Sequence, residues 1–201
     1  MIMRYVFAPV GLITFSLFAQ AQVKSLGRCD GSFDASLEPG SRLSMHLRSG
    51  DINITGTSEP KIVVTCSIDG PNKHGGDVQV KYMASGKSAD LKVSGGPMDR
   101  FHLRIQVPGQ TNLLVRSTAG DMTIDNVVGH KDASLSAGDL TIAVGSAADY
   151  SRAEASVHVG GLEAQPWSVQ KGGFFRSFKQ TNPTGKYYLN AHVGAGGITL
   201  H

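Results

Sequence analysis

Two ten-residue stretches, Val115–Ile124 (VRSTAGDMTI) and Ala133–Ile142 (ASLSAGDLTI), carry the pattern that decides the fold. In each stretch apolar and polar residues alternate, a Gly-Asp pair follows, and the alternation then resumes. Alternation with a period of two is typical of a half-buried β-strand, and a glycine at a fixed place indicates a bend that needs a positive φ or a close backbone approach. Each stretch is therefore predicted to form a strand, a corner and a second strand.

Three further stretches align with these two without gaps, and they are Met45–Ile54 (MHLRSGDINI), Ala155–Ala164 (ASVHVGGLEA) and Ala191–Leu200 (AHVGAGGITL). The last two have a second glycine in place of the aspartate. The corner glycines fall at positions 50, 120, 138, 160 and 196, so the steps are 70, 18, 22 and 36 residues. The last three steps fit a coil of about 20 residues, with the step of 36 as two coils. Coils that bury their apolar sides on one another predict a single-domain, right-handed β-solenoid.

A β-sandwich remains the alternative architecture, because a short glycine-containing corner between alternating strands can also close a hairpin. The range 28–110 is expected to hold irregular, antiparallel strands, since its alternating runs are joined by turns rich in Gly, Pro and Asn. The range 111–201 is expected to hold the regular repeats. No linker composition separates the two ranges, so we expect one continuous core.

Composition narrows the class of protein further. The chain has 25 glycines in 201 residues, which favours many tight corners over long helices. Its 19 Lys and Arg against 16 Asp and Glu give a formal charge of +3 that is not clustered. A protein that tracks phosphates normally shows a concentrated basic patch, so nucleic acid is not an expected partner.

The N-terminal stretch Met1–Ala21 has the form of a signal peptide. Arg4 supplies the positive start, the apolar run Tyr5–Phe18 follows, and Ala19–Ala21 has the small-x-small form of a cleavage site. The apolar run is shorter than the roughly 20 residues needed to span a bilayer. We therefore expect cleavage after Ala21 and export to the periplasm, the cell surface or the medium, with no membrane span in the mature chain. An uncleaved signal anchor is the alternative.

Two cysteines, Cys29 and Cys66, remain after this cleavage. Two thiols in an exported chain commonly pair, so we predict a disulfide, and two separate buried thiols are the alternative. The closed loop would stabilise the fold by roughly 3–4 kcal/mol in the chain-entropy model. Neither cysteine belongs to a Cys-x-x-Cys motif, so redox catalysis and a cysteine-based zinc site have no support.

The Ser-Gly-Asp-Ile and Ala-Gly-Asp units, the leader Phe33–Gly40 (FDASLEPG) and the closing Gly194–Leu200 (GAGGITL) resemble the bacterial family named "putative adhesin". The resemblance covers residues from about 30 to 201. It implies an exported β-solenoid domain of unknown function, and the family brings no catalytic residues to carry over. The fourth and fifth copies depart from the pattern by lacking the aspartate, which weakens any ion-binding role for that column.

Aspartates at equivalent corners, Asp51, Asp121 and Asp139, suggest two roles. They can accept hydrogen bonds from backbone N–H groups in the turns, which we favour, or a ladder of them can bind Ca²⁺. Ca²⁺ is the one cofactor retained as an alternative, although the tandem nine-residue repeat of Ca²⁺-binding rolls is absent. An enzyme on this scaffold would need convergent acids with a base, and the only grouping to nominate is Asp121, Asp139, Arg116 and Lys131. We expect no enzyme.

Five of the seven histidines are evenly spaced along the chain, at positions 46, 74, 102, 130 and 158. A metal ladder would need these histidines to share one structural position. His74 and His130 fall in glycine-rich turns and the other three fall in alternating strands, so we interpret the even spacing as coincidence.

The segment Trp167–Tyr188 is the most unusual part of the chain, because aromatic residues gather there with interleaved Lys and Arg. It can serve as a lid over an open end of the stack, which we favour. Alternatively it is a glycan-stacking or surface-binding patch formed by Trp167, Phe174, Phe175, Arg176, Tyr187 and Tyr188. Burial of Trp167 indicates the lid and exposure indicates binding. The sequence thus predicts an exported, non-enzymatic, adhesion-type interaction module of unknown ligand, with a glycan-binding module as the alternative and a carbohydrate-active enzyme as a third, disfavoured one.

Overall fold

The computed structural model describes residues 20–70, 76–97 and 100–201, and these residues form an all-β fold, as the sequence predicts. Residues 1–19 of the expected signal peptide lie outside the described residues. The strands are β1 (Gln20–Ser25), β2 (Ser32–Ser36), β3 (Arg42–Leu47), β4 (Asp51–Thr57), β5 (Lys61–Ile68), β6 (Gly76–Ser85), β7 (Ser88–Gly96), β8 (Phe101–Pro108), β9 (Asn112–Ala119), β10 (Met122–Asp125), β11 (Lys131–Ala137), β12 (Leu140–Ile142), β13 (Tyr150–Ala164), β14 (Val169–Thr181) and β15 (Tyr187–Leu200). Two single 3₁₀ turns, Ala147–Asp149 and Gln165–Trp167, interrupt them.

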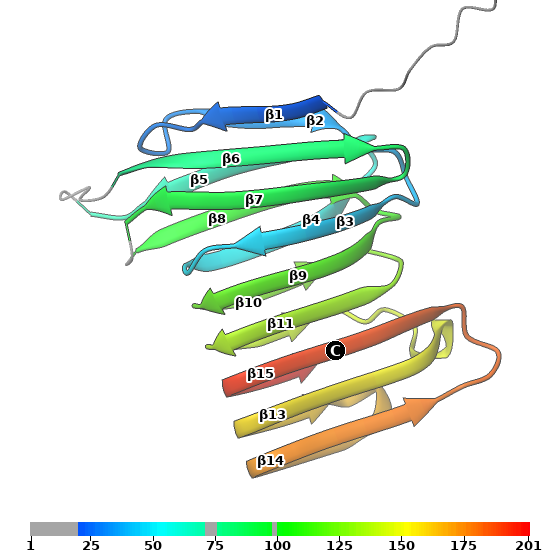
Figure 1. The fold of residues 1–201 in the computed structure, drawn as a ribbon. Helices are drawn as coiled ribbons and strands as arrows, with labels where there is room; N and C mark the ends of the chain where they lie inside the picture. The colour runs from blue at the N-terminus through cyan, green and yellow to red at the C-terminus, as the bar shows by residue number, and fades with distance from the viewer. Residues whose placement is uncertain (1–19, 71–75, 98–99) are drawn as a thin grey trace, which may run out of the picture.

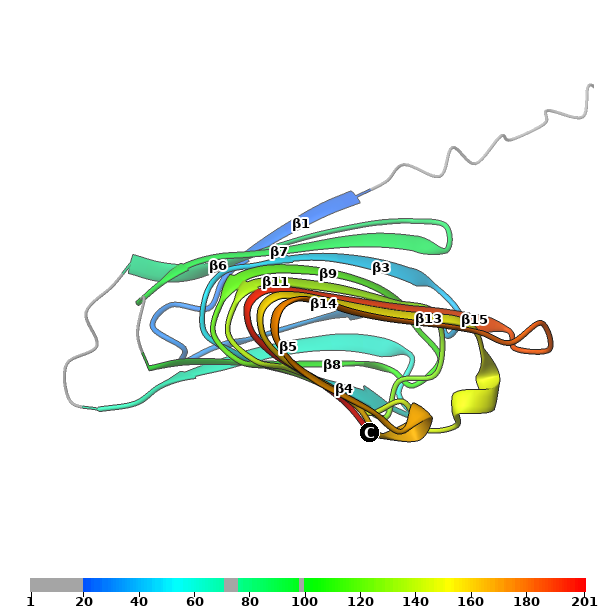
Figure 2. The same cartoon turned by 90° about the horizontal axis from the view of Figure 1, so that it is seen from below.

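The strands form one continuous sheet that folds over into two facing walls (Figures 1 and 2). The first wall runs in the order β1-β6-β7-β3-β9-β11, and the second runs in the order β2-β5-β8-β4-β10-β12. The long strand β15 belongs to both walls, because its first half pairs with β11 and its second half pairs with β12. Strands β13 and β14 follow the same bend. Strands β1 and β2 therefore lie at one end of the stack and β14 lies at the other (Figure 1).

The five repeat copies stack in register through parallel pairing. Their corner glycines form one column, and each has a positive φ between 103° and 144°. A Cβ on Gly120, Gly138, Gly196 or Gly160 would lie less than 3.0 Å from the carbonyl oxygen of the glycine next to it in the column. Only a residue without a side chain permits this spacing, so the Gly at the corner is required by the stacking itself. The column comprises Gly50, Gly120, Gly138, Gly196 and Gly160.

The order of the copies in space differs from their order along the chain, because the fifth copy lies between the third and the fourth. The interpretation of the 36-residue step as two coils is wrong. After β13 the chain turns at Gln165–Trp167, where Ser168 adopts a left-handed φ of 54° and its N–H donates to the Gln165 carbonyl at 3.0 Å. This tight reversal sends β14 back antiparallel to β13, and β15 then returns parallel to β13 on its other side.

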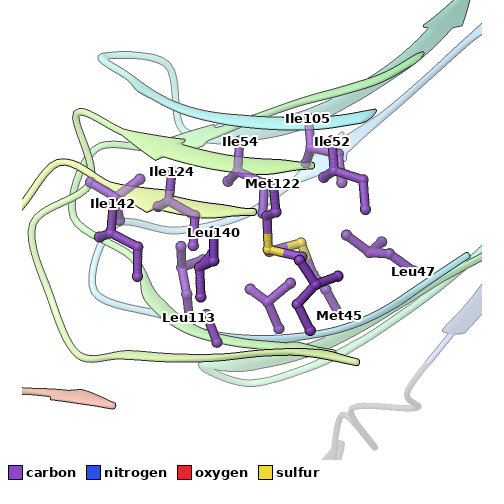
Figure 3. Close-up of a cluster of buried hydrophobic side chains, with 14 of the residues drawn as sticks. Met45, Leu47, Ile52, Ile54, Ile105, Leu113, Met122, Ile124, Leu140 and Ile142 are labelled. Atoms are coloured by element: carbon purple, nitrogen blue, oxygen red, sulfur yellow. The ribbon is translucent and has the colours of Figure 1, made fainter. Parts of the chain in front are cut away.

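Alternation places one hydrophobic core between the walls. Ile52, Met122 and Leu140 of the second wall point towards Met45 and Leu113 of the first (Figure 3). Each of these side chains is at most 3% exposed, and burying one stabilises the fold by about 1.5–3 kcal/mol. Residues from both the 28–110 and the 111–201 range contribute to this core.

One inward column of the first wall becomes smaller towards β14. Met45 and Val115 are followed in register by Ala133, Ala191 and Ala155. The facing column of the second wall keeps large side chains along the stack, with Ile52, Met122, Leu140, Ile198 and Leu162 in register.

The opposite end is closed by aromatic packing and a disulfide. Phe33 of β2 packs on Tyr82 of β6 with ring centroids 5.7 Å apart, and the Tyr82 hydroxyl donates to the Ser36 carbonyl at 2.8 Å. Cys29 and Cys66 form a disulfide with their Cα atoms 5.0 Å apart. The bond ties the connection between β1 and β2 to β5.

Candidate functional site

Two corner aspartates accept hydrogen bonds from the backbone of the adjacent repeat copy. Asp121 accepts a hydrogen bond from the Asp139 N–H at 3.1 Å through Oδ1, and Asp139 accepts one from the Gly197 N–H at 2.7 Å. These bonds satisfy donors that the bend turns away from the strand ladder. Both aspartates thus have the backbone-accepting role that we favoured, except that the donor belongs to the neighbouring repeat copy and not to the same turn.

Replacing Asp139 tests this role. Asp139→Ala is expected to lower the free energy of unfolding by about 0.5–1 kcal/mol, because the Gly197 N–H loses its acceptor. Asp139→Asn keeps an acceptor oxygen and should cost less. Urea unfolding with and without Ca²⁺ measures both effects. A Ca²⁺-dependent rise in stability that both substitutions abolish equally would contradict the hydrogen-bonding role and favour the cation.

Asp51 has a different environment. His102 lies between Asp51 and Asp69, with 3.2 Å from its Nδ1 to Asp51 Oδ2 and 3.0 Å from its Nε2 to Asp69 Oδ2. All three side chains are exposed to solvent by more than a third. Within residues 20–70, 76–97 and 100–201, no group of three or more His, Cys, Asp or Glu side chains has an arrangement that could hold a metal ion.

The grouping nominated for catalysis is not brought together. Asp121 and Asp139 lie at the corner, whereas Arg116 lies on the outer face of β9 and contacts Asp132 Oδ1 at 3.0 Å through Nη1. Lys131 points into the core, because it lies at the inner position of β11 beside Leu113 and Leu189. The nomination of Lys131 was wrong because it overlooked the alternation, which counted back from Ala133 places the Lys131 side chain on the buried face of the strand.

Lys131 is fully buried and makes its polar contact with another buried residue. Its Nζ donates to the Tyr150 hydroxyl and lies 5.0 Å from the centre of the Tyr150 ring. Burial lowers the pKa of Lys131 to about 8, although the negative charge of Asp149 acts in the opposite direction. Burial also raises the pKa of Tyr150 to about 12, with Asp149 and Tyr187 adding to the rise. Lys131 is therefore a desolvated core group with no access to a substrate.

The four evenly spaced histidines that the structure describes occupy unrelated positions. His46 lies on the outer face of β3, His102 bridges the two aspartates described above, and His130 stacks on Tyr188 with ring centroids 4.2 Å apart. His158 lies near Phe175, at 5.8 Å between ring centroids. His74 lies outside the described residues.

Sequence reasoning missed a second histidine contact on the outer face of the first wall. Ser156 Oγ and His192 Nδ1 are 2.9 Å apart, and the His192 ring lies 4.9 Å from that of His158. Burial is the main cause that lowers the pKa of His192, and the charges of His158 and Arg116 add to it. Ser156 and His192 occupy the same position in copies four and five. Their equivalent positions in the repeat could have predicted this contact, but only if the fourth and fifth copies were known to lie side by side.

The aromatic segment separates into three environments. Trp167 is partly buried and packs on the buried Phe178, with ring centroids 5.2 Å apart, where both border the core. These two residues cover the β14 end of the stack. Trp167 is half-buried, so it meets neither condition of the burial criterion, and the lid stays a prediction.

Phe174 and Phe175 are instead exposed, by 67% and 80%, at the bend of β14. Next to them, the Arg176 Nε donates to the Gly172 carbonyl at 2.7 Å. Val159, directly opposite Phe174 on β13, is 46% exposed. This exposed apolar group, which we call the β14 corner patch, consists of Phe174, Phe175 and Val159.

Tyr187 and Tyr188 lie at the other end of the strands. Tyr187 packs near Tyr150 and His130, and Tyr188 stacks on His130, whose Nδ1 accepts the Tyr188 backbone N–H at 3.0 Å. Tyr188 is aligned with Arg152 and through it with Thr181, six residues along β14 from Phe175. Six residues of strand correspond to about 20 Å. The six residues proposed as one patch from the sequence therefore do not form one surface.

A groove of about 740 Å³ lies beside the corner column at its β14 end. Gly197, Gly161 and Gly172, which are in register, line it, and Gly161 and Gly197 stand where the first three repeat copies have aspartate. Asp139 and Thr199 are among the side chains that border it. The groove is open to solvent along its length.

Comparisons with known proteins give one structural likeness. The fold is similar to a crystal structure described as a putative cell adhesion protein from Clostridium sporogenes, with 16% sequence identity and a TM-score of 0.43. The likeness covers 91% of this chain and 99% of that chain. No model of a protein family matches the chain, and no curated protein matches it. In the described part of the chain, no helix has the length and apolar character needed to cross a membrane.

Proposed function

We propose that the protein is an exported, non-enzymatic interaction module of the bacterial cell envelope, of adhesion type, built on a scaffold of the β-solenoid kind. The observation that carries the proposal is the β14 corner patch, where two phenylalanines are 67% and 80% exposed at the end of a rigid stack. Large apolar side chains gathered on a surface are a feature of binding sites. Export is supported by the leader pattern and by the Cys29–Cys66 disulfide, which suits an oxidising compartment. Arg116 and Lys131 lie away from the corner pair Asp121 and Asp139, which supports a role without catalysis.

The test is saturable binding of the purified protein to isolated envelopes of its host, measured by co-sedimentation. We expect the double variant Phe174→Ser with Phe175→Ser to weaken this binding at least about tenfold, which is a typical effect for two interface aromatic residues. Tyr188→Ser is the matched control, because Tyr188 is 41% exposed and lies about 20 Å from the patch. Equal binding by the wild type and both variants, or no binding at all, would contradict the proposal.

A glycan-binding module is the second candidate, and the aromatic side chains beside Lys171 and Arg176 favour it. Affinity electrophoresis through a panel of neutral and acidic polysaccharides, with and without Ca²⁺, separates the two candidates. Retention that is lost in the Phe174 and Phe175 variants, and is unchanged in Trp167→Ala, would assign a glycan to the β14 corner patch. Retention lost in Trp167→Ala alone would instead assign it to the partly buried lid.

A further inference from the structure

The longest free edge of the sheet is β14. It pairs with β13 on one side, and within the described residues no strand lies on its other side. It has 13 residues, whereas the edge strands at the opposite end, β1 and β2, have 6 and 5. A free edge presents a row of backbone N–H and C=O groups that can pair with another strand. The β14 edge is therefore the part of the fold best suited to extending the sheet.

Two cations of β14 face the inner side of the open end. Lys171 is directly opposite Leu162 on β13, and Arg176 is directly opposite Val157. Opposed residues of an antiparallel pair point to the same face, and both Leu162 and Val157 are buried in the core. Lys171 and Arg176 therefore project towards the end of the core.

The polar contacts of both cations are made to carbonyl oxygens of β14 itself. Lys171 Nζ donates to the Ser177 carbonyl at 2.7 Å, and Arg176 Nε donates to the Gly172 carbonyl at 2.7 Å. Among the described residues neither cation forms an ion pair, whereas the neighbouring Lys179 contacts Glu154 Oε1 at 3.0 Å. Charge-assisted bonds to a carboxylate are stronger than bonds to a neutral carbonyl. An occupant that supplies carboxylates at this edge would therefore be favoured.

A second copy of the chain does not supply them. The sequence of β14, VQKGGFFRSFKQT, contains no acidic residue. Two copies joined through antiparallel β14 strands would gather two Lys171 and two Arg176 side chains at one junction. Like charges brought together at a partly desolvated interface oppose association, so the edge discriminates against self-pairing.

From these contacts we infer that β14 binds an extended, acidic strand of a partner protein, which adds to the free edge of the sheet. Main-chain hydrogen bonds to β14 supply the pairing. Two carboxylates five positions apart in the added strand, on either side of glycines that pair with Gly172 and Gly173, face inward and take Lys171 and Arg176 from their carbonyl partners. The exposed Phe174 and Phe175 pack on the apolar side chains that lie between those carboxylates. This inference rests on the proposed interaction role and names the partner for the same end of the molecule.

The test uses synthetic, fluorescein-labelled peptides of nine residues and the purified protein, with binding followed by fluorescence anisotropy. One peptide carries two Glu residues five positions apart on either side of a Gly-Gly pair, with Val or Thr elsewhere, a second has Lys in place of each Glu, and a third is the Glu peptide with every backbone nitrogen N-methylated, so that neither edge can donate hydrogen bonds. We expect saturable binding of the first peptide alone, since the second repels the two cations and the third cannot pair with the edge. Binding should weaken as the NaCl concentration rises from about 50 mM to about 500 mM.

The double variant Lys171→Gln with Arg176→Gln is expected to bind the Glu peptide at least about tenfold more weakly, while Lys81→Gln with Lys92→Gln, which removes two exposed charges elsewhere, should bind normally. Thermal unfolding of each variant confirms that its fold is intact. Equal affinity for the wild type and the Lys171 and Arg176 variant overturns the inference, as does absence of binding. Retention on an acidic polysaccharide that depends on Lys171 and Arg176, without peptide binding, also overturns it and assigns a glycan. If the peptide fails while envelope binding persists, the interaction role stands and the acidic strand does not.

Discussion

Gly160→Ala is expected to lower the free energy of unfolding by about 3–5 kcal/mol, whereas Gly161→Ala, one residue away, should change it by less than about 1 kcal/mol. The two glycines are neighbours at the same corner of β13, and the same atoms are added in both variants. The comparison therefore separates the requirement for glycine at the corner column from the general effect of placing alanine in this strand.

The physical reason lies in the stacking of the repeat copies. Gly160 has a φ of 139°, and a Cβ there would lie less than 3.0 Å from the carbonyl carbon and oxygen of Gly196. Because the obstructing atoms belong to backbone in the adjacent coil, relief requires β13 and β15 to separate. At Gly161 a Cβ would meet no atom within 4 Å. Alanine at that site even restricts the unfolded chain, which offsets part of any cost.

Urea unfolding at a fixed pH measures both variants. A cost for Gly160→Ala that equals the cost for Gly161→Ala would show that the corner tolerates a side chain. The stacked column would then not be the reason for the glycine, and the repeat would have to be explained by the turn alone.

The corner column is also the feature that the sequence predicts best. The gap-free alignment of five stretches on one glycine places Gly50, Gly120 and Gly138 at equivalent positions, and the structure stacks them in that register. Alternation on either side of the corner identifies the inward residues, such as Ile124 and Ile142, because the period of two is a direct consequence of strand geometry. Local pattern thus predicts the strands, their corners and their buried faces.

The order of the coils could not be predicted, because equivalent copies share the same alternation and can each pair with any other. The fifth copy is inserted between the third and the fourth by the reversal at Gln165–Trp167, whose left-handed Ser168 has no distinctive sequence signal. The same reversal divides the aromatic segment, since β14 runs away from Trp167 and β15 begins near its far end. Proximity along the chain therefore gave a wrong candidate patch, with Tyr187 and Tyr188 about 20 Å from Phe175.

For Lys131 the alternation pattern and the residue type give opposite predictions, and the residue type led to the wrong one. Its position two residues before Ala133 predicts an inward side chain, yet a lysine in the polar run His130–Asp132 suggests a surface. In the structure it fills the column formed by Leu113 and Leu189 and contacts Tyr150. A buried amine at this place stabilises the fold less than an apolar side chain of similar length would.

Lys131→Met is accordingly expected to raise the free energy of unfolding by about 2 kcal/mol at pH 7, and this advantage should disappear as the pH rises to about 10. The pKa of Lys131 is about 8 in the folded chain against 10.5 for an ordinary lysine. Between these two values the unfolded chain binds more protons than the folded chain, so the stability of the wild type rises with pH. The shift corresponds to about 3 kcal/mol over that window.

Tyr150 has the opposite effect at higher pH. Its pKa of about 12 in the folded chain lies above the ordinary value of 10.0, so stability is lost as the pH rises from about 10 to about 12. The measurement is therefore confined to urea unfolding of the wild type and Lys131→Met at intervals from about pH 7 to about pH 10. Lys81→Met, which removes an exposed lysine from β6, is the control and should follow the wild-type pH dependence. Parallel curves for the wild type and Lys131→Met would contradict the argument, because the depressed pKa of the buried amine is what makes the two curves converge.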